Sequence, residues 1–273
     1  NYLSQHPHAR FFLIVDSFSE DFRLELLPHL YARDRKLMLE RKLGQLYRTT
    51  PYYCAELQGR DSGSRKDDRY QFSALTDAEL LEPWLDCLEN KHLILHGISS
   101  PAHLTALLTK KLHWQADYQL VITKTPGQLR QTFLEKGQLR FSRLVMLSEQ
   151  ANALEALVGE TQKMQTFLQN QRLLPRDVQL TIQLVCSETQ STELDHYDFP
   201  ESETARFVLH KTAEYAGLCQ LPPDGELDSR TLLLSMLRTV QTNQNIYAPA
   251  KRLNNARYWQ IGHYCIAGAI LLF

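Results

Sequence analysis

The segment at residues 119–147, QLVITKTPGQLRQTFLEKGQLRFSRLVML, constrains the fold more than any other part of the chain. Two turn signals, Pro126-Gly127 and Lys136-Gly137, separate runs rich in β-branched, leucine and phenylalanine side chains. Glycine at such positions accepts the backbone angles of tight turns. The segment therefore predicts three consecutive antiparallel strands. A strand–turn–strand with a glycine can also hold a phosphate, so the first turn is a candidate nucleotide loop as well as a hairpin.

The apolar pattern around this meander indicates an α/β chain. We expect further strands at residues 10–16, 22–27, 69–75, 92–98 and 178–186, and helices at 33–48, 76–90, 101–112, 202–216 and 229–241. A long helix is expected after Ser148, which would cap it, and a capping box is expected at 76–79. Residues 56–69 are almost free of apolar side chains and are predicted to form a solvated loop.

Each half of the chain thus contains strands, a helix, a strand and another helix, so a duplicated α/β unit is the predicted organisation. The strand–helix–strand–helix order at 69–112 predicts parallel pairing with right-handed crossovers. We place the first unit at residues 1–115 and the second at 116–245. Residues 246–273 are interpreted as a basic stretch followed by the start of a membrane helix.

Composition narrows the functional class. The net charge is −1 and the isoelectric point is about 6.9, so no overall positive field favours nucleic acid. Five cysteines are scattered without a Cys-x-x-Cys pair, which suggests a reducing compartment rather than a disulfide framework.

The C-terminal run YWQIGHYCIAGAILLF predicts a membrane helix that begins near Tyr258 and is still in progress at Phe273. Aromatic side chains that suit the membrane interface and apolar side chains that suit the lipid core are the predicted anchoring residues: Tyr258, Trp259, Tyr264, Ile266, Ile270, Leu271, Leu272 and Phe273. The basic residues before them, Lys251, Arg252 and Arg257, would keep the preceding units in the cytoplasm. The alternative is a buried C-terminal core helix.

No catalytic constellation is evident in the sequence. It contains no Gly-x-Ser-x-Gly, no Walker loop and no Gly-x-Gly-x-x-Gly. His92 and His96 have the spacing of zinc ligands on a helix, but a strand would hold them too far apart to share a metal. The acidic and histidine residues at 193–199 are predicted to form a solvated loop. We therefore assign no catalytic, cofactor-binding or metal-ligating residue.

The order of three antiparallel strands, a long helix, a strand and more helices resembles an RNase H-like, actin-type subdomain. Two such units before a membrane helix resemble the cytoplasmic actin-like proteins of type IV pilus assembly (PilM) and type II secretion (GspL). Local similarity is found at residues 134–147, at 214–218 and at 243–259. The last of these is similar to the short peptide and basic stretch that precede the membrane helix of GspL or of PilN, the partner of PilM.

This resemblance implies a scaffold on the cytoplasmic side of the bacterial inner membrane. Its expected partners are an assembly or secretion ATPase and inner-membrane platform proteins, and a homodimer is compatible with it. It implies no nucleic-acid partner.

Actin-type ATPases carry Asp-x-Gly in the first hairpin, where the carboxylate acts on Mg²⁺ through water and the glycine amide holds phosphate. Here residues 123–127 lack the acid, and Pro126 removes one backbone N–H. Residues 16–18 have the acid but lack the glycine, and no two glycines are adjacent in the chain. We therefore expect a non-enzymatic scaffold without a cofactor. The alternatives are a nucleotide-binding actin-like ATPase and a soluble α/β protein of another role.

The predicted membrane helix can be tested by fractionation. The chain extended into its natural sequence beyond Phe273 should require detergent, because its apolar C-terminal side chains prefer lipid to water. A version that ends at Asn255 should remain soluble without detergent. A long form that stays in the soluble fraction would contradict the membrane assignment.

Overall fold

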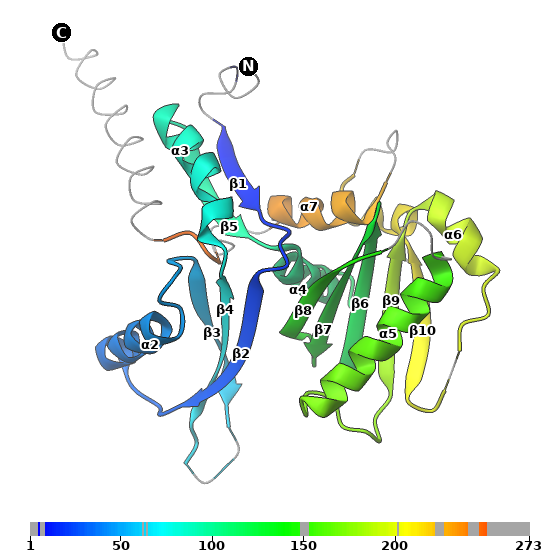
Figure 1. Cartoon of the computed structure of the whole chain (residues 1–273), viewed down its shortest axis with the longest axis horizontal. Helices are drawn as coiled ribbons and strands as arrows, with labels where there is room; N and C mark the ends of the chain where they lie inside the picture. The colour runs from blue at the N-terminus through cyan, green and yellow to red at the C-terminus, as the bar shows by residue number, and fades with distance from the viewer. Residues whose placement is uncertain are drawn as a thin grey trace. The chain divides into compact units, whose positions relative to one another are not determined.

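The computed structural model describes residues 5, 9–61, 63, 65–147, 153–200, 202–221, 227–239 and 246–249. The chain divides into two compact units, one formed by Asn1–Ser100 with Gln241–Phe273 and the other by Pro101–Val240. Both units are mixed α/β (Figure 1). Each is described by itself below.

The second unit is built on a five-stranded sheet in the order β10-β9-β6-β7-β8. The predicted meander forms its antiparallel part: β6 (Tyr118–Thr125), β7 (Gln128–Glu135) and β8 (Gln138–Met146). Strand β9 (Leu180–Cys186) pairs with β6 in parallel, and β10 (Ala205–Lys211) pairs with β9 in parallel. Gly127, Lys136 and Gly137 have positive φ values of 70°, 51° and 73°, as the two hairpin turns require.

Helix α5 (Ala153–Asn170) covers one face of this sheet, as Figure 1 shows. Alternate residues of the strands, such as Leu120, Ile122 and Phe133, form a common core with Leu157, Met164 and Leu168 of α5. Helix α4 (Pro101–Lys111) packs against α7 (Ser229–Thr239) and against β7 and β8. The unit boundary therefore falls before α4, whereas the sequence analysis assigned this helix to the first unit.

The prediction of a helix at 202–216 is wrong. Residues 205–211 form strand β10, and Thr212–Tyr215 form a short 3₁₀ turn, η2. The segment ARFVLHK is rich in residues that favour strands, and it pairs along its whole length with β9. A helix was also missed, since α6 (Glu188–Asp195) extends into the predicted loop at 193–199. Its capping box joins Ser187 and Gln190.

The first unit contains two sheets. Strands β1 (Arg10–Ile14) and β5 (Ile94–Ser99) form a parallel pair. Strands β2 (Glu20–Leu27), β4 (Asp68–Leu75) and β3 (Tyr53–Arg60) form an antiparallel sheet with β4 in the middle. Helix α2 (Ala32–Leu46) packs on this second sheet, while η1 (Ala78–Leu80) and α3 (Glu82–Asn90) connect β4 to β5.

Two predictions for the first unit are therefore wrong. The strands at 69–75 and 92–98 do not pair with each other, because β2 and β3 already occupy both edges of β4 and β5 joins β1 instead. The predicted capping box at 76–79 is also absent, since the Thr76 hydroxyl donates to the carbonyl of Ser19 at 3.0 Å. The first helical turn there is the 3₁₀ turn η1.

The predicted loop at 56–69 is shorter than expected. Strand β3 continues to Arg60 and β4 begins at Asp68, so only residues 61–67 connect them. Backbone pairing does not require apolar side chains, and the polar residues here pair in register with β4 through a bulge at Gly59, whose φ is +124°. Arg60 also forms an ion pair with the buried Asp68 carboxylate at 3.4 Å.

Two buried histidines of the second unit are held in their neutral form. His210 in β10 stacks on Trp114 with ring centroids 3.8 Å apart, and its ring nitrogens lie 2.5 Å from Gln183 Oε1 and 2.6 Å from the Tyr215 hydroxyl. Burial lowers the pKa of His210 to about 4 and that of His103 in α4 to about 3.

These pKa values predict that acid weakens the fold. An unfolded histidine titrates near pH ~6.5, so between that pH and about 4 the unfolded chain binds more protons than the folded one. The free energy of unfolding should then fall by about 1 kcal/mol per pH unit for each histidine. Urea unfolding at pH 7 and pH 5 measures this change. His210→Gln should reduce the pH dependence, because it removes one of the two groups whose pKa burial lowers; an unchanged dependence would contradict this account.

Candidate functional site

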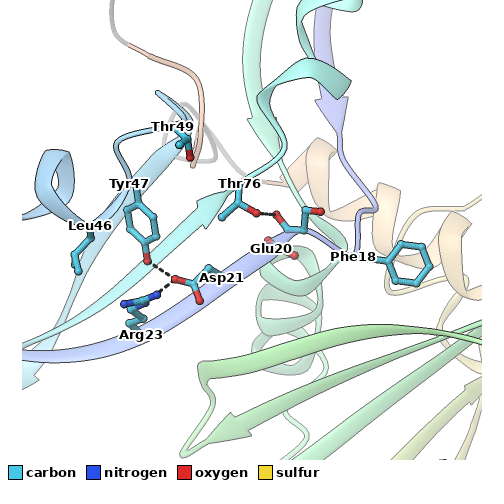
Figure 2. A pocket seen from close by; sticks show the side chains of 9 residues that line it. Phe18, Glu20, Asp21, Arg23, Leu46, Tyr47, Thr49 and Thr76 are labelled. Atoms are coloured by element: carbon cyan, nitrogen blue, oxygen red, sulfur yellow. Dashed lines mark hydrogen bonds and ion pairs between the residues drawn. The ribbon is translucent and has the colours of Figure 1, made fainter.

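A polar hollow of about 330 Å³ lies where the first unit's chain passes from β1 into β2. Figure 2 shows the side chains around it, which come from the start of β2, the end of α2 and the residue after β4. Its lining residues are Phe18, Ser19, Glu20, Asp21, Arg23, Leu46, Tyr47, Thr49 and Thr76. Phe18 extends away from the other labelled side chains, and it is 59% exposed.

Asp21 is the centre of the hydrogen-bond network in this hollow. Its Oδ2 atom accepts from the Tyr47 hydroxyl at 2.9 Å and from Arg23 Nε at 2.7 Å (Figure 2). The carboxylate thereby joins the first residues of β2 to the end of α2. Because Arg23 is half exposed, its ion pair contributes less to stability than the bond from the buried Tyr47.

Local sequence explains this placement. Asp21 and Arg23 alternate along β2 and so face the same side of the sheet, toward α2. Helix α2 ends at Leu46, and the Tyr47 N–H donates to the Leu43 carbonyl at 2.8 Å, which fixes the ring next to β2. Thr76 closes the opposite side through its backbone N–H, which donates to the Ser19 carbonyl at 2.8 Å.

The contacts of the hollow favour the protonated forms of its tyrosine and its arginine. Burial, together with the nearby Asp21 carboxylate, raises the pKa of Tyr47, so its hydroxyl stays protonated and acts as a donor. The hydrogen bond to Asp21 and the charge of that carboxylate raise the pKa of Arg23. The hollow therefore presents a protonated tyrosine hydroxyl and a guanidinium beside the Asp21 carboxylate.

A short C-terminal segment is anchored in the same unit. The N–H groups of Ile246 and Tyr247 both donate to the carbonyl of Ile98 at 3.0 Å. The Tyr247 ring is buried, and its hydroxyl donates to Glu20 Oε1 at 2.7 Å. Glu20 also lines the hollow, so the segment Ile246–Pro249 and the hollow share one side chain. Sequence reasoning found neither feature; the signal available was the alternation of charged and apolar residues in β2.

The candidate nucleotide hairpin of the sequence analysis is an ordinary β6–β7 turn. Its Gly127 carbonyl accepts from Leu147 N–H at 2.9 Å, and the Lys124 carbonyl accepts from the Ser229 hydroxyl at 3.4 Å. The second candidate, at 16–18, forms the link from β1 to β2. There the Ser17 hydroxyl accepts from Ser19 N–H at 3.0 Å, and Asp16 is exposed. A phosphate loop directs backbone N–H donors at its ligand, and at the second candidate one such donor, the Ser19 N–H, is already bonded within the turn.

Among the residues that the structure describes, no group of three or more histidine, cysteine, aspartate or glutamate side chains is arranged to hold a metal ion. His92 lies in the turn before β5 with a φ of 55°, and the His96 ring contacts Phe12 edge-on at 4.8 Å. The two histidines thus have separate local surroundings.

The predicted anchoring residues Tyr258, Trp259, Tyr264, Ile266, Ile270, Leu271, Leu272 and Phe273 lie outside the described residues. The same is true of Lys251, Arg252 and Arg257, and of Ser148 before α5. Within the described part of the chain, no helix combines the length and the apolar character that a membrane span requires.

Comparison with known proteins identifies the class of fold. A chain described as "PilM-PilN type IV pilus biogenesis complex" superposes with a TM-score of 0.55 and 12% sequence identity, over 85% of this chain and 80% of that chain. A Bacteroides thetaiotaomicron protein, described as having an actin-like ATPase fold and unknown function, covers 73% of this chain and 67% of its own, with 8% identity and a TM-score of 0.33. No family model and no curated protein matches. The superposition on the chain of the PilM-PilN complex confirms, for the fold, the resemblance to PilM that the sequence analysis expected.

The hydroxyl of Tyr47 provides a test of the site's architecture. Tyr47→Phe should lower the free energy of unfolding by about 1 kcal/mol, because it removes the bond to Asp21 without creating a large cavity. Tyr53→Phe is the matched control, since the Tyr53 ring stacks on Tyr47 with centroids 6.1 Å apart. Equal urea midpoints for the two variants would contradict the role assigned to the Tyr47–Asp21 bond.

Proposed function

We propose that this protein is a non-enzymatic assembly scaffold of a type IV pilus or a related secretion machine, on the cytoplasmic side of the bacterial inner membrane. The observation that carries the proposal is the superposition with a chain of the PilM-PilN complex over 85% of this chain. A match of that extent covers most of both units rather than one common motif.

The chemistry of the two turns supports the non-enzymatic part of the proposal. Neither turn combines a carboxylate with a glycine that could approach a phosphate. In the β6–β7 turn, the carbonyls of Lys124 and Gly127 already accept bonds from within the unit. A scaffold needs stable surfaces rather than a rearranging phosphate loop, and these internal bonds favour stability.

The anchored segment supports a mechanical link to the membrane. Because Ile246 and Tyr247 bond to Ile98 and Tyr247 bonds to Glu20, the chain that follows Pro249 starts from a fixed point on the first unit. In our proposal the residues from Tyr258 onward enter the inner membrane, and Lys251, Arg252 and Arg257 hold the units on the cytoplasmic side. Force on the membrane helix would then reach the first unit directly.

The solved complex contains PilN as well as PilM. We propose by analogy that this chain assembles with a PilN-like inner-membrane partner and with the ATPase of the same machine. The polar hollow at Asp21 and Tyr47 is the candidate contact surface, since it presents fixed charges and the exposed Phe18 together.

The proposal predicts that Mg-ATP does not bind. The melting temperature of the purified chain should be unchanged at millimolar Mg-ATP, and no phosphate should be released. A saturating nucleotide ligand would instead raise the melting temperature by several degrees, since it stabilises only the folded state. Turnover that disappears in Asp16→Ala would replace the scaffold with the actin-like ATPase.

A cellular experiment tests the scaffold role. Deletion of the gene in its native bacterium should abolish pili or secretion, and the Asp16→Ala variant should restore them as well as the wild type does. Tyr247→Ala should restore them poorly, because it releases the anchored segment. Normal assembly after deletion would contradict the proposed function.

A further inference from the structure

Strand β1 has the sequence of an interior strand but the position of an edge strand. Residues 11–15, FFLIV, are apolar on both faces, a pattern typical of strands buried within a parallel sheet. Among the described residues, however, β1 pairs only with β5. Phe11, Phe12, Leu13 and Ile14 consequently remain only partly buried.

Strands β9 and β5 show how such edges can be completed in this chain, whereas β10, like β1, pairs with a single strand among the described residues. In the second unit β9 is paired on both sides, by β6 and by β10. In the first unit the end of β5 receives the N–H groups of Ile246 and Tyr247 at the Ile98 carbonyl. The free edge of β1 has no corresponding neighbour among the described residues.

An apolar hollow of about 360 Å³ lies beside this strand. Residues 12–16 line one part of it, and Leu80, Leu81 and Trp84 line the rest. Trp84 is 62% exposed and Leu80 is 47% exposed, although both are large apolar side chains. An open strand edge next to exposed apolar side chains has the properties of a protein-binding surface.

The hydrogen bonds of β1 identify which of its backbone groups face outward. The Val15 N–H donates to the Ser99 carbonyl at 2.9 Å, so Val15 and, by alternation, Leu13 direct their backbone groups at β5. The backbone groups of Phe12 and Ile14 therefore point to the free edge. Among the described residues no strand pairs with these two residues, on either side of Leu13, so they can form a new ladder.

We propose that a second copy of this chain adds its own β1 to this edge, antiparallel and in the register that places Leu13 opposite Leu13 of the other copy. Phe12 of each copy then exchanges backbone bonds with Ile14 of the other, and a two-fold axis passes beside Leu13. Rotation about this two-fold axis also brings the Leu80 and Trp84 side chains of both copies to the interface.

Self-pairing fits this surface better than pairing with a differently charged partner. The net charge of −1 produces little repulsion between copies. The patch itself is apolar, with Asp16 the only ionisable residue that lines the hollow, so it presents no charge pattern that a basic or acidic segment would complement. A strand pair with two small hollows is a modest interface, for which dissociation constants in the micromolar range are expected.

Cysteine cross-linking tests the register. In this pairing the Leu13 residues form a non-hydrogen-bonded pair with Cα atoms about 4.5 Å apart, close enough for a disulfide. Under mild oxidation Leu13→Cys in the full chain should form mostly cross-linked dimer, whereas the wild type, Phe12→Cys and the exposed Leu37→Cys should not. Cross-linking of Leu13→Cys no greater than that of Leu37→Cys would overturn the proposal.

Sedimentation velocity provides a second test that leaves the core residue Leu13 intact. Ile14→Lys places a charge at the free edge and should raise the dimer dissociation constant at least tenfold, because edge lysines block strand pairing. Leu57→Lys is the control, since Leu57 is also an exposed residue of an edge strand, β3, and the change in charge is equal. A wild-type chain that sediments as a monomer at about 100 μM, or equal dimerisation by both variants, would overturn the proposal.

Discussion

The occupation of both edges of β4 determines the arrangement of the first unit. Strands β2 and β3 pair with β4 over nearly its whole length, so β5 cannot extend that sheet and joins β1. The chain must then cross from one sheet to the other between β1 and β2, and the Ser19–Thr76 bonds fix this crossing. The polar hollow forms at the crossing, and the free edge of β1 is a second consequence of the same pairing.

Local signals were sufficient to predict the elements that depend on neighbouring residues. The Pro126-Gly127 and Lys136-Gly137 turns gave the meander, Pro101 gave the start of α4, and apolar spacing gave α5. The errors arose where a distant partner decides the conformation. Residues 205–211 form a strand because they pair with β9. Residues 56–60 form a strand because they pair with β4.

The candidate site could be predicted only in part for the same reason. Residues 123–127 have no acid and residues 16–18 have no glycine, and both facts can be read from the sequence. The expectation that neither turn is a phosphate loop therefore follows from the sequence alone. The hollow, in contrast, depends on contacts between residues far apart in the sequence, such as Tyr47 with Asp21 and Tyr247 with Glu20. The hydrogen-bonding capacity of a tyrosine hydroxyl is known from the sequence, but its acceptor is known only from the fold.

Edge strands occur in both units, since β8 and β10 end the sheet of the second unit and β1 pairs only with β5 among the described residues. The two units differ instead in the features that accompany those edges. The first unit contains the polar hollow at Asp21 and the apolar hollow beside β1, and it fixes the segment Ile246–Pro249 through Ile98 and Glu20. A strand edge next to exposed apolar side chains is a surface on which association lowers the free energy, so the interactions of the proposed scaffold are expected on the first unit.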